Sequence, residues 1–91
     1  MIICSCILHL DLYDVHSLKG RRSVLNRLKE KLKTFNVSIM DISGEYPKEA
    51  EMAFLFLSPD RLEAARYREK IENSLLRLFP EYTIELDFEE L

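Results

Sequence analysis

The sequence predicts an α+β fold in which two helices cover one face of a four-stranded antiparallel sheet. Near both ends of the chain, apolar and polar residues alternate with a period of two, which is typical of half-buried strands. Two longer segments repeat apolar residues every three or four positions, which indicates amphipathic helices. Between these segments lies a short run that is apolar at nearly every position, and it predicts a strand covered on both faces.

Length and composition predict one cytoplasmic globular domain over residues 1–91. Hydrophobic residues make up 47% of the chain and charged residues 32%, a balance that can form a core and is not that of a disordered chain. Two cysteines close together cannot form a disulfide framework, which fits a reducing compartment. The apolar N-terminus has no leading basic residues, so we expect neither a signal peptide nor a membrane contact.

The first predicted strand spans Ile2–Tyr13. Its apolar face consists of Ile2, Cys4, Cys6, Leu8, Leu10 and Leu12. Its other face is mixed and includes His9 and Asp11. We interpret Cys4 and Cys6 as buried structural thiols rather than a redox or metal pair, because free cysteine is among the most buried residue types.

A basic amphipathic helix is predicted next, with Ser17 as its N-cap. Its apolar side consists of Val24, Leu25, Leu28, Leu32 and Phe35. Gly20 lies in the first turn and weakens it by roughly 0.5–1 kcal/mol relative to alanine.

Charge is distributed very unevenly along the chain. Between Lys19 and Lys33 there are seven Lys or Arg and one Glu, a local charge of +6, so the other residues carry −9 of the total of −3. This polarity suggests that the helix meets an anionic partner. The alternative is that these side chains only solvate the helix and cover the edge of the core with their stems. The candidate anion-binding residues are Ser17, Lys19, Arg21, Arg22, Arg27, Lys29, Lys31 and Lys33.

A second strand is predicted at Val37–Ile42, and the turn residues Ser43–Lys48 favour a hairpin to a third strand. The third strand, Ala50–Leu57, is apolar on both faces and is therefore expected near the centre of the sheet.

The second helix begins with either Ser58 or Asp60 as its cap and ends at Pro80. Its outer face mixes both signs of charge, which is typical of a solvated surface, and we assign it no binding role. The last strand alternates apolar residues with the acidic residues Glu85, Asp87 and Glu89.

This order of elements, β-α-β-β-α-β, predicts a ferredoxin-like two-layer sandwich with both helices on one face. The open face of the sheet is then expected to be acidic, with His9 and Asp11 beside Glu85, Asp87 and Glu89. RNA-binding domains of the RRM type read bases with aromatic residues on a basic sheet face. An acidic face argues against that mode of recognition.

The best candidate metal cluster consists of His9, Asp11, Asp14 and His16. Their spacing matches no familiar two-histidine motif, and loops often contain Asp for reasons of turn geometry. We therefore predict neither a metal nor a cofactor.

Acylphosphatases share this size and topology, but their chemistry needs a backbone cradle for phosphate together with an Arg and an Asn. This sequence has only two glycines, and Arg21, Arg22 and Asn26 lie on or near a helix. We therefore predict that the protein is not an enzyme.

Two motifs resemble the signatures of the YlxP-like family, small bacterial proteins of unknown function. They are Ser17-Leu18-Lys19 with Arg21-Arg22-Ser23-Val24-Leu25, and Phe35-Asn36-Val37-Ser38. The resemblance extends over nearly the whole chain and includes Leu57-Ser58-Pro59-Asp60. It implies a ferredoxin-like fold, often a dimer, encoded beside genes for translation and ribosome maturation.

Two positions depart from the pattern of that family. Gly20 replaces the usual Glu, which makes the start of the helix more basic. The loop Ser43–Glu49 is one residue shorter and lacks the Trp and Gln of the family. Any function that depends on that loop is altered or lost in this chain.

Two functional hypotheses follow. The first is a non-enzymatic factor that binds ribosomal RNA or ribosomal particles through the basic helix, with little base readout. The second is a homodimeric structural or adaptor domain whose acidic open face binds a protein partner or the basic helix of a second copy. That face is formed by Asp11, Glu85, Asp87 and Glu89.

Overall fold

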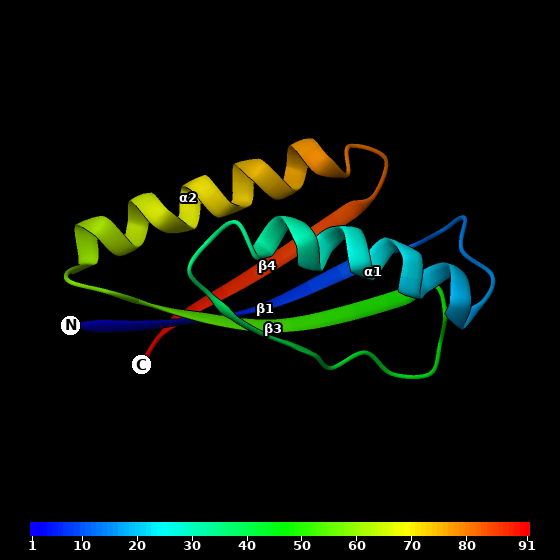
Figure 1. Ribbon diagram of the computed structural model, residues 1–91, viewed down its shortest axis with the longest axis horizontal. Helices are drawn as coiled ribbons and strands as arrows, with labels where there is room; N and C mark the ends of the chain where they lie inside the picture. The colour runs from blue at the N-terminus through cyan, green and yellow to red at the C-terminus, as the bar shows by residue number, and fades with distance from the viewer.

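Four strands and two helices follow one another in the predicted order in a computed structural model that describes residues 1–91. They are β1 (Ile2–Asp11), α1 (Leu18–Leu32), β2 (Ser38–Asp41), β3 (Glu49–Ser58), α2 (Arg61–Leu78) and β4 (Thr83–Glu90). The sheet has the order β2-β3-β1-β4, and all neighbouring strands are antiparallel. Both helices lie on the same side of the sheet (Figure 1). The predicted ferredoxin-like sandwich is confirmed, and β3 lies in the interior of the sheet as predicted, with β1 beside it.

The core lies between the sheet and the helices, and β1 contributes much of it. Cys4, Cys6, Leu8 and Leu10 are at most 1% exposed and all face the helices. Burial raises the pKa of the Cys6 thiol to about 12, so this free cysteine behaves as a small apolar side chain. The strand ends at Asp11, two residues earlier than predicted.

Helix α1 begins where the sequence indicates. The Ser17 hydroxyl accepts a hydrogen bond from the Gly20 amide at 3.0 Å, which confirms the predicted N-cap. A Cβ atom at Gly20 would lie 3.3 Å from that hydroxyl and 3.4 Å from Val15 Cγ1, so glycine suits this tight turn. The helix ends at Leu32, and Phe35 packs against the core from the turn that follows.

Helix α2 uses the second of its two predicted caps. Asp60 Oδ1 accepts a hydrogen bond from the Glu63 amide at 2.8 Å. Ser58 is instead the buried last residue of β3, and its hydroxyl donates to the Asp60 carbonyl. Neither helix is long and apolar enough to cross a membrane.

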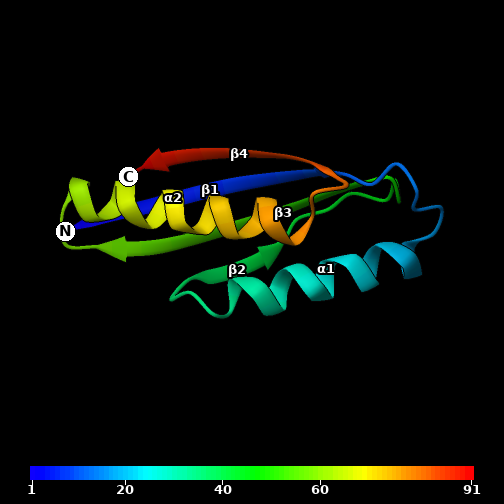
Figure 2. The same cartoon turned by 90° about the horizontal axis from the view of Figure 1, so that it is seen from above.

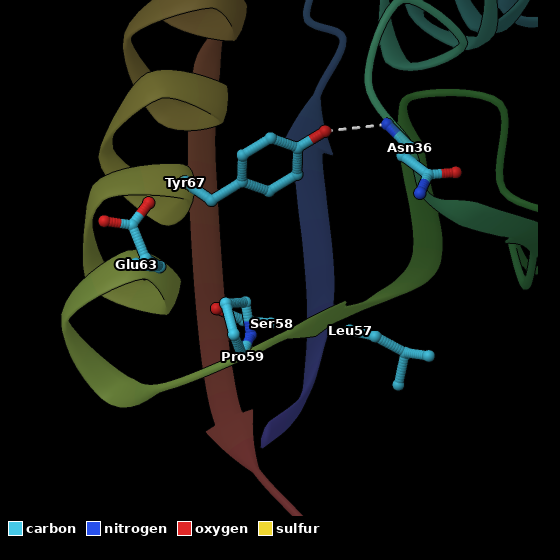
Figure 3. A pocket seen from close by; sticks show the side chains of 6 residues that line it. All are labelled: Asn36, Leu57, Ser58, Pro59, Glu63 and Tyr67. Carbon is cyan, nitrogen blue, oxygen red and sulfur yellow. Dashed lines mark hydrogen bonds between the residues drawn. The ribbon is translucent and has the colours of Figure 1, made fainter. Parts of the chain in front are cut away.

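An aromatic cluster fastens the turn between α1 and β2 to α2. The Tyr67 ring lies edge-on to Phe35 and Phe56, with centroids 5.7 and 4.9 Å away. Its hydroxyl accepts a hydrogen bond from the Asn36 amide at 2.7 Å (Figure 3). Figure 2 shows α1 beside β2, at the edge of the sheet, while α2 lies over the central strands β1 and β3. The contacts of Tyr67 and the position of α1 beside β2 together set which surface of α1 faces outward.

Candidate functional site

The predicted basic residues of α1 separate into groups with different surroundings. The largest group has four cations that, together with the neutral Asn26, recur every three or four residues and so lie on one side of the helix: Lys19, Arg22, Asn26, Lys29 and Lys33. We call these residues the basic stripe. The stripe covers 14 helical steps, or about 21 Å. A depression of about 270 Å³ beside it is lined by Arg22, Asn26 and Lys29 together with Asp41, so the stripe runs along the β2 edge.

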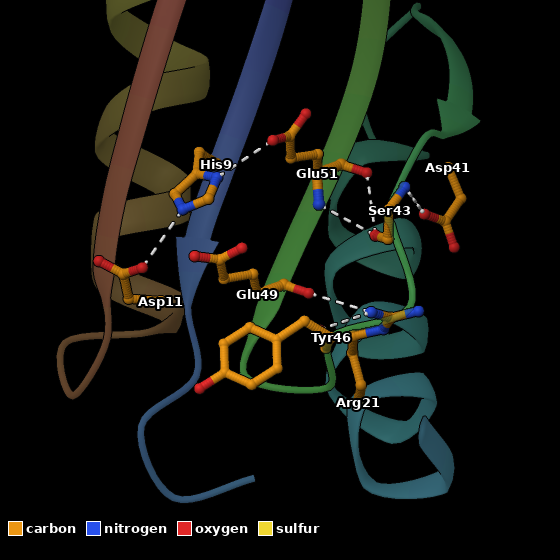
Figure 4. Close-up of polar contacts among 8 residues, drawn as sticks. All are labelled: His9, Asp11, Arg21, Asp41, Ser43, Tyr46, Glu49 and Glu51. Atoms are coloured by element: carbon orange, nitrogen blue, oxygen red, sulfur yellow. Dashed lines mark hydrogen bonds and ion pairs between the residues drawn. The ribbon is translucent and has the colours of Figure 1, made fainter. Parts of the chain in front are cut away.

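Arg21 and Ser17 have roles within the fold. Arg21 Nη1 donates to the carbonyls of Tyr46 and Glu49, at 3.0 and 3.1 Å (Figure 4). It thereby holds the 42–48 loop against α1. The Ser17 hydroxyl is occupied by its capping bond.

Arg27 and Lys31 lie on the opposite side of α1, toward α2. The Arg27 guanidinium lies 4.9 Å from the centre of the Phe79 ring, a cation–π geometry. Lys31 lines a depression of about 280 Å³ together with Ser74 and Arg77 of α2. These side chains form a second, smaller basic group between the helices.

The positive charge of α1 is not neutralised by ion pairs. None of the seven Lys and Arg residues from 19 to 33 has a carboxylate oxygen within 4.0 Å, whereas on α2 Arg66 pairs with Glu63 at 2.9 Å. Among the acidic side chains, Asp41 comes nearest to acting as a counter-ion for the basic residues of α1. Its partial burial raises its pKa, but hydrogen bonds from Ser43 and the charges of Lys29 and Arg21 outweigh this effect and hold it below the usual value. Of the stripe cations, Lys29 acts on Asp41, and Lys29 and Arg22 line the same depression as this carboxylate.

The open face of the sheet carries the predicted acidic residues on its β4 side. Strand register places Glu85 opposite His9, Asp87 opposite Ile7, and Glu89 opposite Ser5. We call Glu85, Asp87 and Glu89 the acidic ladder. The prediction that the whole face is acidic is wrong. Away from β4, the same face exposes apolar side chains, which belong to Ile3, Ile7, Met40, Leu55 and Leu57.

His9 lies between carboxylates on this face (Figure 4). Its Nε2 atom is 3.2 Å from Asp11 Oδ1, and its Nδ1 atom is 3.5 Å from Glu51 Oε1. Burial lowers the pKa of His9, but the hydrogen bonds and charges of Asp11 and Glu51 outweigh it and raise the pKa above 6.5. The arrangement favours an imidazolium that donates from both nitrogens.

The predicted metal cluster is not assembled as expected. Asp14 accepts a hydrogen bond from the Tyr82 hydroxyl at 2.8 Å, and burial, together with this bond, raises the pKa of Tyr82 to about 12. Asp14 and His16 do not join His9 and Asp11. Glu49 does, and the three possible donor atoms lie within 4.8 Å of one another. Because both His9 nitrogens face carboxylates, the cluster is better described as a charged hydrogen-bond network.

We expect the His9→Gln substitution to flatten the pH dependence of stability above pH 6.5. A histidine whose pKa is raised by folding stabilises the fold fully below its unfolded pKa, and this stabilisation is lost as the pH rises through the folded pKa. Urea midpoints at about pH 6 and pH 8.5 should therefore differ more in the wild type than in the variant. If the difference between the two urea midpoints is the same in the wild type and in the His9→Gln variant, the described network is contradicted.

A further depression, of about 220 Å³, was not predicted from the sequence. It lies where the α1–β2 turn meets the start of α2 and is lined by Asn36, Glu63 and Tyr67 (Figure 3). The residues come from segments about 30 positions apart, and no local motif connects them. It holds no cluster of cations or nucleophiles.

Comparisons with known proteins support the fold and the family. No curated protein matches the sequence. The structure is similar to the de novo designed protein Foldit4, with a TM-score of 0.58, 15% identity, and coverage of 98% of this chain and 97% of the design. It is also similar to the designed protein LFR1 1 with ferredoxin fold, solved by NMR, with a TM-score of 0.55, 14% identity, and coverage of 98% and 86%. At these identities the likeness shows the fold alone. Residues 3–87 match the family described as "Protein of unknown function (DUF503)", and the chain therefore belongs to the DUF503 family.

Proposed function

We propose that this domain is a non-enzymatic factor that binds the phosphate backbone of RNA through the basic stripe of α1. The observation that carries the proposal is the absence of ion pairs along α1, since a helix that is only solvated usually mixes charges as α2 does. Ribosomal RNA within ribosomal particles is the partner that we propose, because the YlxP-like family that the sequence resembles is encoded beside genes for translation and ribosome maturation. The YlxP-like assignment itself is part of this proposal.

The chemistry of the stripe favours contacts to phosphate over contacts to bases. Lys and Arg are the main donors to phosphate oxygens, and such contacts set position without reading sequence. Asn26 is the one neutral hydrogen-bonding side chain in the stripe, and no aromatic residue accompanies it. The carboxylates on the opposite face of the sheet repel phosphate, so the RNA would approach from the helical side alone.

Two structural facts show that part of the positive charge of α1 also has a role within the fold. Lys29 and Lys31 lie in the last turn of α1, where cations also stabilise the helix through its dipole. Arg21 is engaged with loop carbonyls. The proposal therefore rests on Lys19, Arg22, Lys29 and Lys33, with Arg27 and Lys31 as a secondary contact.

We expect binding to a short RNA duplex to weaken steeply with salt. Four neutralised phosphates give a slope of about −3 to −4 in log K against log salt, because each contributes about 0.7–0.9. Raising the salt from about 50 to 200 mM should then weaken binding by about 100-fold, measured by fluorescence anisotropy. A slope near zero, or no binding at the lower salt, would contradict the proposal.

The second candidate function is a homodimeric adaptor in which the basic stripe of one copy meets the acidic ladder of another. Opposite charge on two separate surfaces of the same chain favours it. Sedimentation equilibrium without RNA distinguishes the two candidates. A dimer that dissociates both with salt and on reversal of the stripe charges supports the adaptor, whereas a monomer that binds RNA supports the first proposal.

A further inference from the structure

The open face of the sheet carries an apolar surface that the helices do not cover. We call its members the apolar strip: Ile3, Ile7, Met40, Ala53, Leu55 and Leu57. The five larger side chains are 37–65% exposed, although they lie on regular strands. Register places Met40, Ala53 and Ile7 side by side across β2, β3 and β1, and Leu57 opposite Ile3 two rows away. With strands about 4.8 Å apart and rows about 7 Å apart, the strip is continuous.

The strip is hollowed at its centre. A depression of about 260 Å³ is lined by Ile7, Met40, Ala53 and Leu55, with Ser5 and Ser38 at its margin. Small side chains line it on three strands: Ala53 lies between Ile7 and Met40, and in the next row Ser5 and Ser38 lie on either side of Leu55. A depression of this size accommodates one or two large apolar side chains. Contiguous apolar surfaces of this kind mark interaction sites on soluble domains.

Carboxylates border the apolar strip, and no cation from Lys or Arg does. Asp87 and Glu89 flank it on the β4 side, directly opposite Ile7 and Ser5. Glu51 and the His9 network bound the end nearer the β1–α1 loop. All residues of the face come from four strands, and none of them is Lys or Arg.

This charge pattern decides what can cover the strip. Two copies packed face to face with β4 over β4 would bring two sets of carboxylates together with no Lys or Arg to offset them, which disfavours that form of self-association. The basic stripe of a second copy has the right charge, but its members are polar and cannot fill an apolar depression. RNA is repelled by the acidic ladder. The complementary occupant has both apolar side chains and cations.

We propose that the open face is a docking site for an amphipathic basic segment of another protein. An apolar side chain of that segment occupies the depression over Ala53, and its Lys or Arg residues pair with Asp87 and Glu89. The site lies on the opposite side of the sheet from α1, so it is independent of the RNA-binding proposal (Figure 1). A domain with both surfaces could hold a basic protein segment and an RNA backbone at once.

The test uses three synthetic peptides of about 18 residues, or five helical turns. The first has a face of Leu flanked by Lys, the second has Ser in place of Leu, and the third has Glu in place of Lys. Each is titrated into the labelled protein, and amide shifts and Kd are measured by NMR. The variants are Ile7→Thr with Leu55→Thr, which keeps strand propensity, and Asp87→Asn with Glu89→Gln. Leu62→Gln on α2 is the matched control, because Leu62 is 62% exposed and lies outside the strip.

We expect the Leu/Lys peptide to shift amides of β1 and β3 around Ile7, Ala53 and Leu55. Each of the other peptides, and each double variant, should bind about tenfold more weakly or worse, while Leu62→Gln is unchanged. The proposal is overturned if the Ser/Lys peptide binds as well as the Leu/Lys peptide, or if the Ile7 and Leu55 variant keeps full affinity. It is also overturned if the free protein is a dimer that Leu55→Thr dissociates. A negative result with these peptides does not bear on RNA binding by α1, because the RNA duplex titration tests the basic stripe and not the open face of the sheet.

Discussion

The variant Arg22→Glu, Lys29→Glu, Lys33→Glu is expected to bind an RNA duplex at least about 100-fold more weakly than the wild type. Charge-assisted hydrogen bonds contribute about 1.5–3 kcal/mol each, so the loss of two already accounts for this factor. The new carboxylates also repel phosphate. Anisotropy at about 50 mM salt, where wild-type binding is strongest, gives the measurement.

A matched control changes the net charge by the same amount on the other helix. Arg61→Glu, Arg66→Glu, Lys70→Glu replaces three exposed cations of α2 and removes only surface ion pairs, which contribute about 0–1 kcal/mol each. This variant should retain most of the affinity. If both triple variants lose binding equally, the effect is one of total charge and the basic stripe has no special role.

Replacement of Phe79 by alanine is expected to lower the free energy of unfolding by about 3–5 kcal/mol. Phe79 is fully buried at the end of α2, and its ring lies 5.8 Å from that of Tyr82. The substitution leaves a cavity and removes the surface on which Arg27 rests. The loss is a large part of the 5–15 kcal/mol that stabilises a typical domain. Urea unfolding monitored by circular dichroism measures it.

Leu76→Ala is the control for this prediction. Leu76 lies only three positions earlier but is 47% exposed, so its truncation should cost less than about 1 kcal/mol. Similar midpoints for the two variants would show that the C-terminal end of α2 is not packed as described.

Most of the fold could be predicted because local pattern and tertiary structure agree. The period of two in β1 and β4 placed their apolar residues toward the helices, and the apolar content on both faces of β3 predicted its central position. Capping chemistry located the start of α1 at Ser17. These features depend on neighbours within a few residues, which a single sequence displays.

The surfaces were harder to predict because they depend on register between distant segments. The apolar strip joins Ile7 to Ala53, which are 46 positions apart, and Ala53 to Met40. Alternation within one strand does not reveal which side chains meet across the sheet, so the acidic residues of β4 dominated the prediction for the whole face. The same reason hid the bonds from Arg21 to the carbonyls of Tyr46 and Glu49.

The sequence predicted the composition of the basic helix and the two sides that carry its cations, but not what each side borders. A helical wheel separates Arg22, Lys29 and Lys33 from Arg27 and Lys31, but only the tertiary structure shows that the first set borders β2 and the second faces α2. The charge of +6 is therefore divided between two surfaces. Neither of these two surfaces contains an ion pair, and only the folded structure reveals this.

Co-sedimentation with purified ribosomal subunits tests the central claim most directly. The wild type, the basic-stripe triple variant and the α2 control variant are compared at about 50 and 150 mM salt. We predict that the wild type and the α2 control sediment with the subunits, less so at the higher salt, while the basic-stripe variant stays in the supernatant. Absence of wild-type binding at both salt concentrations, or equal sedimentation of the basic-stripe variant, would contradict the account.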